Sequence, residues 1–100
     1  MKQIRIEYTL RATADLALVK QRIAEFVAGL REHRATRYYA SFQHAQSPLR
    51  FTHVGAFDEA SLPDLQAQPW FGAFTAFLRE QSEVGPEVAQ LVEVASTGTR

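Results

Sequence analysis

Apolar and polar residues alternate along several stretches of the chain, which predicts β-strands with one buried face. The predicted strands are residues 2–10, 36–44, 49–57 and 88–95. In the first, Ile4, Ile6, Tyr8 and Leu10 point to the same side. A Gln-Ser-Pro turn at 46–48 joins the second and third strands, so these two form an antiparallel hairpin.

Other stretches follow the helical period. A first helix is expected to begin after Thr13 as its N-cap and to end near His33, where cations favour a helix C-terminus. A short helix is expected to begin at Ser61. It leads into an aromatic helix from Pro69 to about Glu83, because proline fits the first helical position.

The aromatic helix holds the single tryptophan and several of the phenylalanines of the chain. Trp70, Phe74 and Phe77 recur at helical spacing, with Phe71 beside them. Such a face packs into a core, and it can also line a cavity for a flat apolar ligand. A Gly-Pro pair at 85–86 is expected to end the helix before the last strand.

The predicted order is strand, helix, strand, strand, helix pair, strand. This is the ferredoxin-like βαββαβ arrangement, an α+β fold with an antiparallel sheet and helices on one face. The other face would carry polar residues, which are Arg5, Glu7, Arg37, Ser41, Arg50 and Thr52. This assignment turns the side chains of Tyr38, Ala40 and Phe42 toward the helices.

Composition narrows the class of protein. One hundred residues with 46% apolar content fit one globular domain spanning 1–100. The formal net charge is zero without a basic stripe, so nucleic acid is not an expected partner. No apolar run could span a membrane, and the cysteine-free chain begins without a signal-peptide core, so we expect a cytoplasmic protein.

The run Gln68-Pro69-Trp70-Phe71, placed after a strand and a short helix, resembles the antibiotic biosynthesis monooxygenase family. Family members usually show Ser-Pro-x-Phe at this point, so Pro69 and Phe71 match and Gln68 replaces the serine. The order of elements and the length match over the whole chain. The resemblance implies a dimeric α/β barrel, in which two protomers form a homodimer by packing sheet against sheet.

The resemblance also implies an activity, the oxygenation of a small aromatic or quinol-type substrate by dioxygen without a cofactor. A deprotonated hydroquinone can give an electron to dioxygen unaided, so the protein has to hold the ring, exclude water and manage protons. His53 is the suggested proton acceptor, because it interrupts an apolar strand face. The alternative is a histidine that hydrogen-bonds to a neighbouring strand or lies exposed at the sheet edge.

Tyr38 is the suggested catalytic hydrogen-bond donor. The suggested substrate-binding residues are Trp70, Phe74, Phe51, Tyr8, Phe71 and Arg79. For the aromatic residues the alternative is a place in the core, and for Arg79 it is a surface or interface ion pair with no role in substrate binding.

The sequence lacks the residue patterns of several kinds of site. The three histidines lack metal-ligand spacing, so no metal site is expected. Haem degradation, which the same family includes, needs a tryptophan and a histidine where this chain has Leu65 and Thr75. Two hypotheses follow: a cofactor-independent monooxygenase, and a non-catalytic dimeric domain that binds an apolar small molecule. A lyase or isomerase on the same fold is a third reading.

Overall fold

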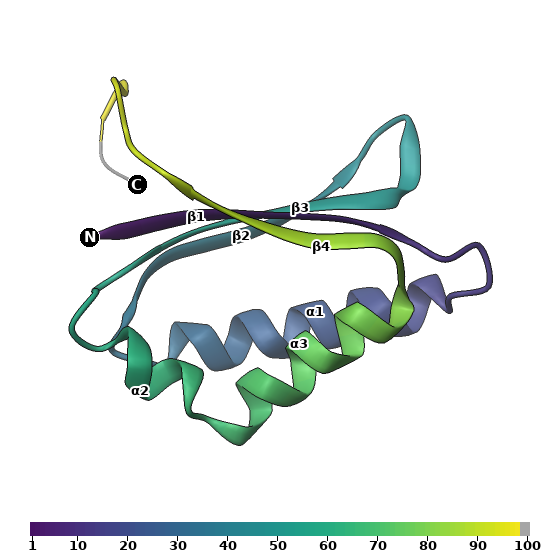
Figure 1. The fold of residues 1–100 in the computed structure, drawn as a ribbon, viewed down its shortest axis with the longest axis horizontal. Helices are drawn as coiled ribbons and strands as arrows, with labels where there is room; N and C mark the ends of the chain where they lie inside the picture. Colours follow the sequence, from purple (N-terminus) through teal and green to yellow (C-terminus); the bar gives the residue numbers. More distant parts are fainter. Residues whose placement is uncertain (99–100) are drawn as a thin grey trace.

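The structure is a computed structural model, and it describes residues 1–98. Within this range, strands and helices follow one another as the sequence predicts (Figure 1). They are β1 (Lys2–Leu10), α1 (Leu16–Arg31), β2 (Thr36–His44), β3 (Ser47–Phe57), α2 (Leu62–Gln66), α3 (Pro69–Gln81) and β4 (Ser82–Leu91). No helix in the described range is long and apolar enough to cross a lipid bilayer.

The strands form one antiparallel sheet in the order β2-β3-β1-β4. Figure 1 shows α1, α2 and α3 together on one face of this sheet. This confirms the predicted ferredoxin-like α+β fold. In the described part of the chain, no helix covers the opposite face, which we call the open face.

Helix α1 packs its apolar stripe onto the sheet. Its buried residues are Val19, Ile23, Phe26 and Leu30, as the helical period predicts. The cap differs from the prediction, because Asp15 and not Thr13 precedes the first turn. The Asp15 carboxylate accepts a hydrogen bond from the Leu18 backbone N–H at 3.1 Å.

Helix α3 begins at Pro69 as predicted and packs across α1. The rings of Phe74 and Phe26 stack with centroids 4.0 Å apart. Both rings are buried, at the centre of the layer between the helices and the sheet. This stack fixes the side of α3 that faces the sheet, and with it the residues that can line a cavity there.

The last strand begins earlier than predicted. Helix α3 ends at Gln81, and β4 starts at the next residue and continues through the Gly-Pro pair to Leu91. Gly85 has a φ of +81° where the pairing of β4 with β1 shifts register, so this glycine serves a bulge within the strand. Pro86 is tolerated because β4 lies at the edge of the sheet.

The predicted faces of β2 are reversed. Tyr39 pairs with Gly55 and Ser41 pairs with His53, so Tyr39 and Ser41 share the helix-covered face. Tyr38 pairs with Ala56, on the opposite face of the sheet. The register shifts between Thr36 and Tyr38, and a one-residue shift exchanges the two faces of a strand.

The open face carries a polar network centred on Glu7. The Thr52 hydroxyl accepts a hydrogen bond from His44 Nε2 at 2.8 Å and donates one to the Glu7 carboxylate at 3.0 Å. Arg50 and Arg5 approach the same carboxylate at 3.5 and 3.7 Å. The predicted polar character is therefore confirmed for β1 and β3.

Candidate active site

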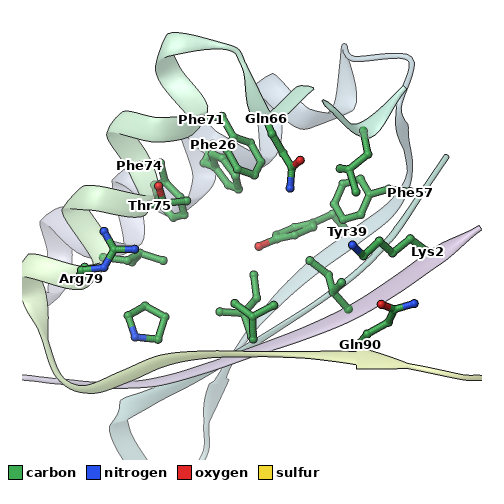
Figure 2. A pocket seen from close by; sticks show the side chains of 16 residues that line it. Lys2, Phe26, Tyr39, Phe57, Gln66, Phe71, Phe74, Thr75, Arg79 and Gln90 are labelled. Carbon is green, nitrogen blue, oxygen red and sulfur yellow. The ribbon is translucent and has the colours of Figure 1, made fainter. Parts of the chain in front are cut away.

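A cavity of about 410 Å³ lies between the sheet and the helices α2 and α3 (Figure 2). The sequence predicts a pocket at this place. Phe26, Phe71, Phe74 and Leu78 wall its helix side, and Ile6 belongs to its sheet side. Cavities of this size with mainly apolar walls are typical of small-molecule sites.

Polar groups among the lining residues distinguish the cavity from a packing defect. The hydroxyl of Tyr39 points into its middle, while Arg79 and Lys2 lie toward opposite ends (Figure 2). The lining includes no carboxylate. Within residues 1–98, neither Lys2 nor Arg79 forms an ion pair with an acidic side chain. The cavity therefore favours a ligand with negative charge on oxygen.

Behind Tyr39 lies a buried chain of hydrogen bonds. The Tyr39 hydroxyl is 2.7 Å from His53 Nδ1, and the Tyr8 hydroxyl is 2.8 Å from His53 Nε2. His53 is 0% exposed and Tyr8 is 2% exposed. The three side chains come from β2, β3 and β1, which are neighbours in the sheet.

Burial controls the protonation of this chain. It lowers the pKa of the His53 imidazole from 6.5 to about 4, because no nearby acid compensates for lost hydration. Burial also raises the pKa of the Tyr8 hydroxyl, and that of Tyr39 rises by burial and by the proximity of Tyr8. At neutral pH all three groups are uncharged and both tyrosines keep their protons.

Three of the predicted substrate-binding residues line the cavity, namely Phe71, Phe74 and Arg79. Trp70 instead lies over α1, in a separate shallow depression beside Gly29, and is 36% exposed. Tyr8 and Phe51 stack on each other in the core, with centroids 5.6 Å apart, and do not reach the cavity.

Neither of the two predicted catalytic residues lines the cavity, and their catalytic roles stay predictions. Tyr38 lies on the wrong face for the cavity, and its neighbour Tyr39 occupies the predicted place. His53 does not line the cavity, and its Nδ1 lies 2.7 Å from the hydroxyl of Tyr39, which does. The alternative interpretation, a histidine hydrogen-bonded to neighbouring strands, describes its contacts.

Gly55 is the signal that could have identified Tyr39. A Cβ at this glycine would lie 2.8 Å from the Tyr39 ring and 2.7 Å from the Phe57 ring. A glycine inside a buried strand face often marks the close approach of a bulky neighbour. Gly55 lies two residues from His53, on the same face of β3, and pairs with Tyr39 of β2. The glycine therefore indicates that a bulky side chain from the neighbouring strand packs beside His53.

Metal ligands do not gather in the described structure. Across residues 1–98, no group of three or more His, Cys, Asp or Glu side chains is arranged to hold a metal ion. His33 has structural contacts instead. Its Nδ1 accepts a hydrogen bond from the Ala35 backbone N–H at 3.1 Å, and its Nε2 lies 3.5 Å from the Asp64 carboxylate.

Comparison with known proteins places this architecture among antibiotic biosynthesis monooxygenase folds. No protein-family model matches the chain, and no curated protein matches it in sequence. A crystal structure described as an antibiotic biosynthesis monooxygenase superposes with a TM-score of 0.83 and 18% identity, covering 95% of this chain and 100% of that one.

Two further structures agree. SnoaB from Streptomyces nogalater, described as a cofactor-independent oxygenase and solved in a mutant form, has a TM-score of 0.82 and 13% identity, covering 98% of this chain and 97% of that one. Rv0793 from Mycobacterium tuberculosis has a TM-score of 0.81 and 14% identity, covering 97% and 98%. At these identities the comparisons establish the fold.

Proposed function

We propose that this protein is a cofactor-independent monooxygenase that binds a small aromatic or quinol-type substrate as its phenolate anion. The observation that carries the proposal is the lining of the cavity, where aromatic walls meet two cations, Lys2 and Arg79, and no carboxylate. The fold shared with SnoaB, an oxygenase by its description, supports the same class of reaction.

The proposed chemistry needs an electron-rich anion. The bound phenolate transfers one electron to dioxygen, and the resulting radical pair combines to form a carbon–oxygen bond. The peroxide anion formed in this way takes up a proton from solvent, and at a carbon that carried two hydrogens in the neutral substrate, loss of water from the hydroperoxide leaves a carbonyl group. One oxygen atom of dioxygen stays in the product and the other leaves as water.

The chain's own residues have separate roles in this scheme. Phe71 and Phe74 hold the ring of the substrate between the helices and the sheet. Lys2 and Arg79 stabilise the phenolate and lower the pKa of the bound phenol, so the substrate proton leaves to solvent. His53 acts through Tyr39, because both its ring nitrogens already have tyrosine partners.

A non-catalytic binding domain is the second candidate. One observation favours it: His53 is buried with both nitrogens hydrogen-bonded, as in a structural histidine, which leaves the cavity without a free base. On this view the cavity holds an apolar metabolite, and the hydrogen-bonded chain serves stability.

Oxygen uptake separates the two candidates. Purified, metal-stripped protein is given hydroquinones and anthrone-like phenols, and uptake is compared with that of Thr75→Phe, which fills the cavity. Ala76→Phe is the matched control, since Ala76 is an exposed neighbour outside the lining. Uptake that Thr75→Phe abolishes and Ala76→Phe retains supports the oxygenase. No uptake across the panel favours the binding domain.

We also propose a homodimer that pairs the open faces of two sheets. Phe42 supports this pairing, because it pairs with Thr52 on the open face and is 51% exposed. Sedimentation is expected to give a dimer for the unaltered protein and a monomer for Phe42→Asp. Leu18→Asp, on the exposed side of α1, should remain dimeric. A monomer at all concentrations for the unaltered protein would contradict this pairing.

A further inference from the structure

We propose that Tyr8 and His53 are positioning residues that fix the Tyr39 hydroxyl as a hydrogen-bond donor to an acceptor oxygen of the ligand. The inference rests on the proposed function for an aromatic ligand in the cavity. It adds the group that this ligand presents at the middle of the cavity, which is a carbonyl or phenolate oxygen.

The hydrogens that the three rings can donate limit how they pair. A neutral imidazole has one N–H, which donates, and one bare nitrogen, which accepts. Each nitrogen of His53 faces a tyrosine hydroxyl, at 2.8 Å for Tyr8 and 2.7 Å for Tyr39. One tyrosine therefore donates to the ring and the other accepts from it, and the tautomer of His53 decides which.

Tyr8 decides between the two tautomers. Its hydroxyl is buried, and within residues 1–98 its hydrogen-bond partner is His53 Nε2. If Nε2 carried the hydrogen, the Tyr8 proton would have no acceptor in the core, and an unsatisfied buried donor is costly. Tyr8 therefore donates to a bare Nε2, and the hydrogen of the imidazole lies on Nδ1.

The consequence appears at Tyr39. The Nδ1–H donates to the Tyr39 oxygen, so the hydroxyl proton of Tyr39 turns away from His53 and into the cavity. Figure 2 shows this hydroxyl directed into the cavity, toward the side where Phe74, Thr75 and Arg79 lie. A ligand atom in contact with Tyr39 has to accept a hydrogen bond. The same polarity prevents Tyr39 from passing a proton to Nδ1, in keeping with release of the substrate proton to solvent.

The tautomer is measured by long-range ¹H–¹⁵N NMR of the ligand-free protein at neutral pH. We expect the hydrogen of His53 on Nδ1, and a hydrogen on Nε2 would overturn the proposal. In Tyr8→Phe the bias disappears, so both nitrogens are expected to show partial protonation. A single Nδ1–H tautomer in Tyr8→Phe would remove Tyr8 from the proposed role.

Ligand binding tests the same polarity from the cavity side. The probes are 9-fluorenone and fluorene, which share a flat shape while only fluorenone has an acceptor oxygen. Oxygen is excluded so that no turnover is needed. We expect Tyr39→Phe to reduce the preference for fluorenone about three- to tenfold, as for the loss of one hydrogen bond. Tyr38→Phe, outside the cavity lining, should leave the preference unchanged.

The outcomes are distinct from those of the oxygen-uptake experiment. A preference for fluorenone that depends on Tyr39 supports the inference even in a protein that consumes no oxygen. An equal preference in the unaltered protein and in Tyr39→Phe overturns it. Failure of both probes to bind overturns the ligand half of the proposal, whatever the tautomer of His53.

Discussion

The two faces of the sheet carry polar groups in opposite physical settings. On the helix-covered face, Tyr8, His53 and Tyr39 are uncharged and His53 is fully buried. On the open face, Glu7 meets Arg5 and Arg50, both of them about half exposed. Hydrogen bonds in the first setting are directional and costly to break, whereas solvent and salt weaken the second.

The difference shows where a small domain can orient a ligand. In the buried chain of Tyr8, His53 and Tyr39, each hydrogen bond has one direction. The Tyr39 hydroxyl at the end of this chain therefore presents a fixed donor to the cavity. The charged network around Glu7 has no comparable constraint, because its members can exchange partners and bind water. It serves the surface of the sheet, and Phe42 beside it is the group suited to docking.

The largest expected effect comes from removing the aromatic stack of the covered face. Phe74→Ala should lower the free energy of unfolding by about 3–5 kcal/mol, because it leaves a void against Phe26. Phe42→Ala on the open face should cost far less in the monomer, since that ring is half exposed. Urea unfolding of both variants at low concentration checks the contrast, and equal losses would contradict it.

The second-largest effect is expected in the pH dependence of stability, which should depend on the protonation of His53. The unfolded imidazole binds a proton near pH 6.5 and the folded one only near pH 4, so the unfolded state holds more protons between these values. Stability is therefore complete above pH 6.5 and falls as pH decreases to 4, by about 3 kcal/mol in total.

Urea unfolding across this pH range tests the assignment. His53→Gln should lose this part of the slope. Hydrogen bonds from Thr52 and Ser61 lower the pKa of the Glu7 and Asp58 carboxyl groups, so these two groups also lose stability toward the acid end of the range, and the comparison with His53→Gln separates their part of the slope from that of His53. A slope between pH 6.5 and 4 that persists unchanged in His53→Gln would show that His53 is not its source.

Gly55→Ala should have a smaller effect that is specific to the cavity. The added methyl would overlap the Tyr39 and Phe57 rings, which we expect to cost about 1–3 kcal/mol and to displace the Tyr39 hydroxyl. Gly72→Ala is the control, because its Cβ meets open space on α3 and should be neutral or stabilising. Thermal unfolding and fluorenone affinity together measure the result, and unchanged values for Gly55→Ala would refute the packing argument.

The smallest effect is expected on the open face. In the monomeric Phe42→Asp background, where the open face meets solvent, Glu7→Gln removes a carboxylate that screened cations and Thr52 share, so its effect on stability should be slight and should vanish in high salt. Unfolding midpoints at low and high ionic strength measure it. A large loss that is insensitive to salt would erase the contrast between the two faces.

The fold was accessible from the sequence because its signals are periodic. The apolar–polar alternation of β1 and the apolar stripe of α1 each extend over many residues. One residue that departs from the pattern therefore does not change the predicted element. Local irregularities were not accessible. Gly85 and Pro86 read as a break after α3, while the edge position of β4 lets the strand continue through them.

The site was predicted in part for the same reason. The structure brings Phe71, Phe74 and Arg79 of α3 to the cavity, and their role in substrate binding stays a prediction. Tyr38 was expected to face the helices, but a register shift near Thr36 exchanged the faces of β2 and brought Tyr39 to that side instead. The cytoplasmic location and the homodimer stay predictions.

The most direct test of the central claim uses 4-nitrophenol, whose absorbance reports its own ionisation in the cavity. Lys2, Arg79 and the Tyr39 donor should stabilise the bound anion against the unfavourable desolvation by Phe71 and Phe74. The pKa of the bound phenol is expected to lie below its value in water. Arg79→Gln should raise it, and Lys20→Gln on the exposed side of α1 should not. A bound pKa equal to or above the value in water would contradict the claim that this cavity is built for a phenolate.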